Sequence, residues 1–150
     1  INCYYGIVME SGGASVNLTD VTITNNIWPI YYGVNSSLSV NGSCSFTGNT
    51  RNAVYVGLSS ITTALTFPKV NVPYYFASSF TVQNGATLTI GSGNILKFPL
   101  SYGLIVNGTL IADAEVGENI FFTSTNDQIL RNSNISSPHF DIHNDIKNRA

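Results

Sequence analysis

Acids and bases that could perform catalysis are few in this chain and lie far apart. Tyrosines and cysteines aside, the first 112 residues contain only Glu10, Asp20, Arg51, Lys69 and Lys97 as ionisable groups. General acid–base catalysis needs an acid of raised pKa close to a base. These five side chains fall in different sections of a repeating pattern, so we expect no catalytic residues, and the chain is predicted not to be an enzyme.

Two further groups of residues have the types that bind metals. Asp113, Glu115 and Glu118 alternate in one loop, where carboxylates can wrap a calcium ion, although a solvated turn is the commoner result. His139 and His143 are four residues apart, a spacing that ligates metals on a helix, but Pro138 and polar neighbours surround them. We therefore predict no metal site and no cofactor.

The composition excludes several classes of function. Charged residues are only 9% of the 150 residues, against about 25% in average domains, and the net charge is −2. A chain with this charge has no basic surface for nucleic acid. It also lacks an apolar stretch of about 18 residues, so we predict no membrane insertion. Scarce charge with abundant Asn, Thr and Tyr favours an extracellular or cell-surface location.

Short apolar runs return along the chain at intervals of roughly two dozen residues, which predicts a repeat protein. They cover residues 6–9, 29–32, 53–56, 74–76, 95–98 and 120–122. Two more alternating runs lie between successive members of this series, separated by Asn-Gly or Asn-rich turns. Each repeat therefore divides into three predicted strands, and no segment has the length and pattern of a helix.

A coil explains this pattern better than hairpins do. An Asn-Gly step often marks a hairpin, but here the same order of short strands recurs along the chain. Stacking each strand on its equivalent in the next repeat buries the apolar rows in one core and satisfies the backbone through parallel ladders. A β-sandwich is the alternative. We predict a single-stranded parallel β-helix, an all-β solenoid of about five to six coils over residues 1–127, followed by an irregular C-terminal tail or linker over 128–150.

Residues 72–127 resemble a known group. The stretches 85–90, 103–112 and 120–124 are similar to right-handed parallel β-helix repeat segments of large bacterial and archaeal secreted or cell-surface proteins. The resemblance implies a right-handed coil. It implies little about activity, since such coils occur in lyases, hydrolases, adhesins and inert fibres. Ser92-Gly93 and Ala114-Glu115 replace the group's usual Pro-Gly and Gly-Thr, which puts the shape of these corners in doubt.

The alternation of the first strand in each repeat predicts a column of outward side chains. If Ile7, Ile30, Val54, Tyr74, Leu96 and Ile120 face the core, the column consists of Val8, Tyr31, Tyr55, Tyr75, Lys97 and Phe121. Stacked aromatic residues form either a self-supporting ladder or a docking stripe for a glycan or a protein. We take Tyr31, Tyr55, Tyr75 and Phe121 as the candidate binding stripe.

These features rank three functions. The first is a non-catalytic structural or adhesive scaffold, such as a stalk segment or the subunit of a filament. Its partners would be other copies of the chain or flanking domains of a longer parent, because solenoid ends expose strand edges that need covering. The second is a polysaccharide-binding module that uses the tyrosines. A fragment of a polysaccharide lyase or hydrolase is the third.

Overall fold

The computed structural model describes residues 2–10, 12–33 and 36–127. The described residues contain fourteen β-strands and no helix. The strands are β1 (Cys3–Met9), β2 (Ser15–Thr19), β3 (Asn26–Tyr32), β4 (Ser37–Asn41), β5 (Val54–Val56), β6 (Ser60–Ile61), β7 (Leu65–Phe67), β8 (Tyr74–Phe76), β9 (Phe80–Val82), β10 (Thr87–Ile90), β11 (Ile95–Phe98), β12 (Leu104–Val106), β13 (Thr109–Ala112) and β14 (Phe121–Ser124). The predicted tail over 128–150, with His139 and His143, lies outside the described residues.

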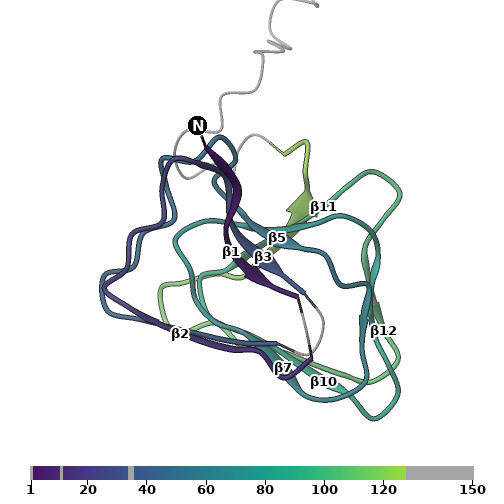
Figure 1. Ribbon diagram of the computed structural model, residues 1–150. Helices are drawn as coiled ribbons and strands as arrows, with labels where there is room; N and C mark the ends of the chain where they lie inside the picture. The colour runs from purple at the N-terminus through teal and green to yellow at the C-terminus, as the bar shows by residue number, and fades with distance from the viewer. Residues whose placement is uncertain (1, 11, 34–35, 128–150) are drawn as a thin grey trace, which may run out of the picture.

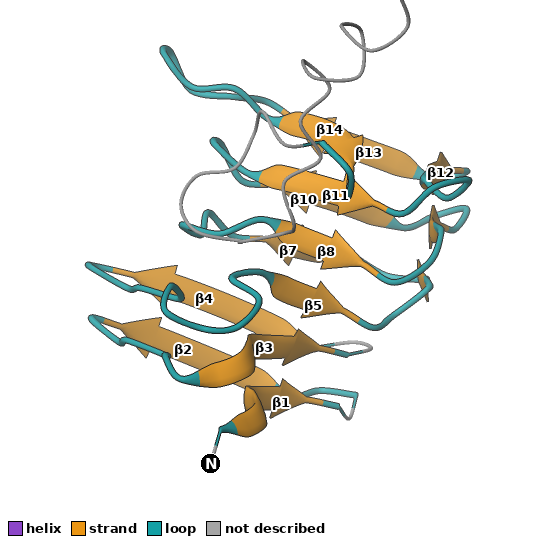
Figure 2. Ribbon diagram, turned by 90° about the horizontal axis from the view of Figure 1, so that it is seen from above, coloured by secondary structure: helices purple, strands orange, loops and turns teal. Residues whose placement is uncertain are grey.

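The strands stack into a parallel β-solenoid of about five turns, as predicted. One strand from each of the five turns, together with β14 that follows the fifth, forms a six-stranded sheet in the order β1-β3-β5-β8-β11-β14, and every neighbouring pair in it is parallel. Viewed along its axis the chain traces superimposed rings (Figure 1), and from the side the strands lie one above another (Figure 2). Parallel stacking satisfies the backbone of each turn through its neighbours.

The cross-section changes between the second turn and the third. From the third turn on, three sheets surround the core, because β6, β9 and β12 form a second stack and β7, β10 and β13 a third. In the first two turns β2 and β4 pair only with each other, and the predicted third strand is reduced to one bridge between Thr22 and Ser45. The prediction of three strands in every repeat is therefore wrong for these two turns.

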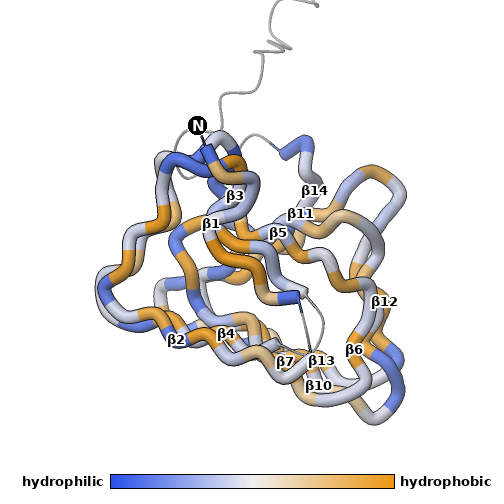
Figure 3. Tube along the Cα trace, in the orientation of Figure 1, coloured by the Kyte–Doolittle hydropathy of each residue, from blue (hydrophilic) through white to orange (hydrophobic). Residues whose placement is uncertain are grey.

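The core is a column of apolar side chains that runs through all the turns. In the six-stranded sheet, Ile30, Val54, Tyr74 and Leu96 lie in register and are completely buried. Aromatic rings fill the middle of the tube, where Phe76 stacks on Phe98 with 4.5 Å between ring centroids. Hydrophobic positions recur on every side of the ring (Figure 3), as expected for a coil whose three faces all point one row of side chains inward.

Buried asparagines hold the corners between turns. The Nδ2 group of Asn49 donates hydrogen bonds to the carbonyls of Ile23 and Phe46 at 2.9 and 2.8 Å, and its Oδ1 accepts one from the Asn26 amide at 3.0 Å. Asn94 likewise donates to two carbonyls of the preceding turn, at 3.0 and 3.1 Å. A corner turns backbone groups away from the ladders, so a buried amide side chain replaces the missing partners.

Tight corners also require left-handed backbone conformations. Gly48 has φ 75° and stacks on Asn25, which has φ 61°. A Cβ on Gly48 would lie 2.4 Å from the Thr24 hydroxyl, so glycine is needed there both for its conformation and for the close approach.

Candidate interaction surface

Three of the predicted stripe residues stack on the outer face of the six-stranded sheet. Tyr31 pairs in register with Tyr55, and Tyr55 with Tyr75. The ring centroids of Tyr31 and Tyr55 are 5.6 Å apart with 18° between the planes, and those of Tyr55 and Tyr75 are 5.9 Å apart with 25°. Successive turns of a parallel sheet repeat about every 4.8 Å, so identical side chains at one register position stack face to face. We call these residues the tyrosine column.

The ends of the column differ from the prediction. Phe121 pairs with Ile95, and Thr123 pairs with Lys97, so Thr123 and not Phe121 continues the column. The sequence pattern placed Ile120 in the inward row, whereas the register gives that place to Phe122. Lys97 occupies the expected position above Tyr75, yet it is buried, and its Nζ donates a 2.9 Å hydrogen bond to the carbonyl of Asp127.

Two aromatic residues that the pattern did not assign to the stripe complete it. The Trp28 ring lies 4.9 Å from the ring of Tyr55 and 5.2 Å from that of Tyr75, and it is 2% exposed. Tyr5, which pairs with Trp28, packs its ring 5.0 Å from Tyr31. Alternation assigns Trp28 the same face as Ile30, but β3 is strongly twisted at its start (Figure 2), and there the two-residue period fails.

Arg51 is the charged residue beside these rings. Its guanidinium carbon lies 4.9 Å from the centre of the Trp28 ring, a cation–π geometry. Arg51 is exposed, whereas the Trp28 ring beneath it is enclosed by side chains of its own molecule. The sequence contains a single Trp and few cations. A search for an Arg about one repeat away from the Trp could therefore have found this pair.

The surroundings raise the pKa of two of these phenols, Tyr55 and Tyr5. Burial raises the pKa of Tyr55, neighbouring Tyr75 and Tyr31 raise it further, and Arg51 opposes them. Burial and the adjacent tyrosines also raise the pKa of Tyr5. A phenol with a raised pKa stays protonated at neutral pH and keeps its O–H donor. Tyr55 and Tyr5 therefore keep their hydroxyl donors among the surrounding aromatic rings.

Stacking limits what this surface can bind. Both faces of the Tyr55 ring are occupied, one by Tyr31 and the other by Tyr75. A sugar that stacks on an aromatic residue needs a free ring face, whereas this column offers ring edges and hydroxyls. The arrangement suits a self-supporting ladder or contact with another protein surface better than sugar stacking.

The acidic loop forms an ion pair and not a cluster. The Lys69 ammonium pairs with Glu118, and the Ser92 hydroxyl donates to the other carboxylate oxygen at 2.6 Å. The hydrogen bond from Lys69, then that from Ser92, lowers the pKa of Glu118. Glu115 joins this group only through its backbone amide, which donates to Ser92. Within the described ranges no three His, Cys, Asp or Glu residues come close enough to hold a metal, Asp113 included.

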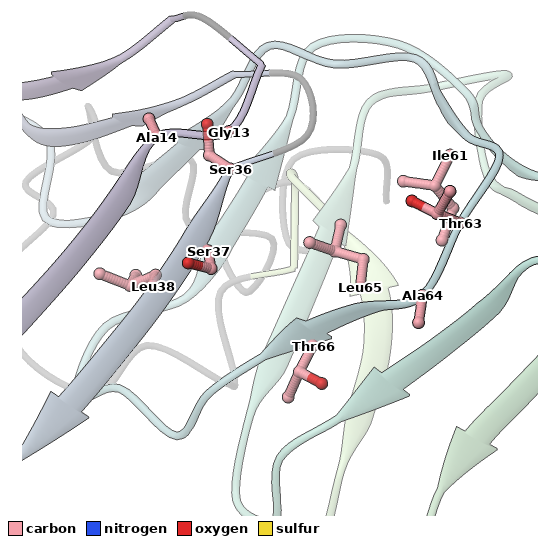
Figure 4. Close-up of a pocket in the computed structure, with 10 residues that line it drawn as sticks. All are labelled: Gly13, Ala14, Ser36, Ser37, Leu38, Ile61, Thr63, Ala64, Leu65 and Thr66. Carbon is pink, nitrogen blue, oxygen red and sulfur yellow. The ribbon is translucent and has the colours of Figure 1, made fainter.

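A pocket of about 350 Å³ opens where the cross-section changes, between β4 and β7 (Figure 4). It is lined by Gly13, Ala14, Ser36, Ser37, Leu38, Ile61, Thr63, Ala64, Leu65 and Thr66. None of these side chains ionises near neutral pH, so the lining offers neither a general acid nor a general base.

Comparison with known proteins gives one short similarity. No protein-family model matches the chain, and no solved structure matches it. Among curated proteins, the chain is similar to Protein bark beetle of Drosophila melanogaster, with 44% identity over 48 residues, which are 32% of this chain. The match spans about 2% of the length of that protein. The described residues include no helix that is long and apolar enough to cross a membrane.

Proposed function

We propose that this chain is a non-catalytic structural segment of an extracellular or cell-surface protein, in which the solenoid acts as a rigid spacer or adhesive scaffold. The observation that carries the proposal is that buried polar side chains find their hydrogen-bond partners within the chain itself. Among the described residues, no buried side-chain nitrogen or oxygen lacks a hydrogen-bond partner. Binding and catalytic sites often leave such groups aimed at a ligand, whereas here they hold corners together.

Two further observations support the scaffold role. The core and the six-stranded sheet continue through every turn, so each turn supports the next as in other solenoids. The similar stretch in Protein bark beetle is a small part of a far longer protein, as a spacer segment would be. The proposal predicts high resistance to proteolysis over residues 12–33 and 36–127, and no turnover in a broad screen of acidic and neutral polysaccharides. Release of unsaturated or reducing sugars by the chain would refute it.

Polysaccharide binding on the tyrosine column is the second candidate. A row of tyrosine hydroxyls beside an exposed guanidinium favours it, because both groups hydrogen-bond to sugar oxygens. Glycan arrays with Tyr31→Ala and Tyr55→Ala test it, and Tyr102→Ala, an exposed tyrosine outside the column, is the matched control. Binding that both column variants lose and the control keeps would favour this candidate over the plain scaffold. Equal binding by all three variants would exclude it.

A further inference from the structure

The tyrosine column holds three phenols at one register position in three successive turns. Tyr31, Tyr55 and Tyr75 are partners in the six-stranded sheet, so their Cα atoms repeat about every 4.8 Å along it. The rings of Tyr31 and Tyr55 are 18° from parallel, and those of Tyr55 and Tyr75 are 25° from parallel. The fold therefore holds neighbouring phenols next to each other, and the backbone ladders keep them from moving apart.

A glycine in the third turn makes room for the first of these rings. A Cβ on Gly57 would lie 2.3 Å from the hydroxyl oxygen of Tyr31 and 2.5 Å from the ring carbon that carries it. Gly57 does not have a left-handed φ, so the backbone conformation does not require a glycine there. Its missing side chain lets the phenol of Tyr31 lie against the next turn, on the face where Tyr55 also points outward.

The hydroxyls of the column differ from those of the tyrosines that face the core. Tyr32 and Tyr74 are completely buried, and their hydroxyls donate to the carbonyls of Ser36 and Pro68, at 2.7 Å in each case. The column members are half-buried, and within the part of the chain that the structure describes their hydroxyls form no hydrogen bond. Oxidation of a phenol requires its proton to leave, and a half-buried hydroxyl can pass that proton to water. Of the tyrosines in β3, β5 and β8, the column members are therefore the ones open to oxidation.

We propose that the tyrosine column is a site of oxidative cross-linking, at which neighbouring phenols of one chain are joined as dityrosine. Each of two tyrosines loses one electron and one proton, and the two phenoxyl radicals form a carbon–carbon bond between ring carbons that adjoin the hydroxyls. The hydrogen on each bonded carbon then moves as a proton to the phenolic oxygen, which restores both aromatic rings. The oxidant is hydrogen peroxide acting through a haem peroxidase: its O–O bond breaks, and it takes up the two electrons and two protons to give two water molecules.

The register decides which phenols can be joined. The ring of Tyr55 lies 5.6 Å from that of Tyr31 and 5.9 Å from that of Tyr75, between centroids. Tyr31 and Tyr75 are two turns apart, about 9.6 Å along the sheet, with the ring of Tyr55 between them. Tyr55 is therefore the shared member of both links, and no link forms in the column without it.

Each link joins two successive turns covalently. The two cysteines of the chain are free, so no disulfide holds the turns together. A dityrosine between turns restricts the unfolded chain as a disulfide does, and the linked chain should unfold at a higher temperature. The inference requires only the register of the column and does not depend on the scaffold role proposed above.

Peroxidase and hydrogen peroxide applied to the full chain at low protein concentration test the inference. A Tyr4→Phe, Tyr5→Phe background removes the two phenols of β1 that also lie near the column. We expect dityrosine fluorescence in the monomer, a mass lower by two hydrogen atoms, and peptides linked through Tyr31 and Tyr55 or through Tyr55 and Tyr75. The yield per chain should not change with protein concentration, because the reacting groups belong to one molecule.

Single Tyr→Phe changes in this background identify the reacting pair. Tyr55→Phe keeps the stacked ring but should lower the dityrosine yield at least about tenfold, because the remaining phenols are two turns apart. Tyr31→Phe and Tyr75→Phe should each keep one link, and Tyr102→Phe, at an exposed tyrosine outside the column, should keep both.

Thermal unfolding of the treated monomers gives a second readout. The cross-linked chain should have a higher Tm than the untreated chain, whereas treatment should leave the Tm of Tyr55→Phe unchanged. Equal dityrosine yields in Tyr55→Phe and Tyr102→Phe, links only between molecules, or no dityrosine at all would overturn the inference.

Discussion

Asn49 provides the sharpest test of how the corners hold the solenoid. Its amide lies between the first two turns and is 8% exposed. Asn49→Ala removes the acceptor of the Asn26 amide and the donor to the carbonyls of Ile23 and Phe46. No ladder replaces these partners, because the corner directs the groups away from the sheets.

The cost follows from the groups that lose their partners. A buried donor or acceptor left unsatisfied costs about 1–3 kcal/mol, and the two carbonyls, which keep a second lone pair, cost less than the amide. We expect Asn49→Ala to lower the free energy of unfolding by about 3 kcal/mol, and Tm by about 6–12 °C for a domain of this size. Alanine also leaves a small cavity, which adds to the loss.

Urea denaturation monitored by circular dichroism measures this difference. Asn41→Ala is the matched control, because Asn41 is exposed and its side chain donates only to the Ser39 hydroxyl. The control should stay within about 0.5 kcal/mol of the native chain, with an unchanged m-value in both variants. If Asn49→Ala and Asn41→Ala unfolded at the same urea concentration, the hydrogen bonds of the corner asparagines would not contribute the stability proposed for them.

Three other changes probe the column, the core and the surface ion pair. Tyr55→Ala should lower the free energy of unfolding by about 1–3 kcal/mol and shift the Trp28 fluorescence to the red, because the Trp28 ring becomes exposed to water. Tyr4→Ala, a change at an exposed tyrosine, should have neither effect. An unshifted spectrum in Tyr55→Ala would argue against the packing described. Phe76→Ala should cost about 3–5 kcal/mol in thermal unfolding, since its ring is fully buried, and a loss below about 1 kcal/mol would contradict a close-packed core. For Glu118, an NMR titration should give a pKa below its ordinary 4.5 that returns toward that value in Lys69→Ala; the stabilisation that accompanies a lowered carboxyl pKa is present above the ordinary value and is lost as pH falls through the lowered one. An unchanged Glu118 pKa in that variant would show that the ion pair is absent in solution.

Much of the fold could be predicted from the sequence because the repeat carries its own register. Ile30, Val54, Tyr74 and Leu96 recur at nearly constant spacing, and a two-residue period then fixes which neighbours face outward. The tyrosine column could be predicted for the same reason. Phe121 was misplaced because the last repeat is longer: 26 residues separate Leu96 from its register partner Phe122, against 20 to 24 between the earlier partners. A local apolar run does not reveal how many residues a corner absorbs.

The sequence alone determined a charge-poor parallel coil with an apolar inside and a row of tyrosines outside, since alternation and period are local properties of the chain. Only the tertiary structure decided that the first two turns are narrower, that Trp28 packs against the tyrosines and that Lys97 is buried. Each of these features depends on where corners bring distant turns together, and that is set by packing between turns and not by the pattern within one.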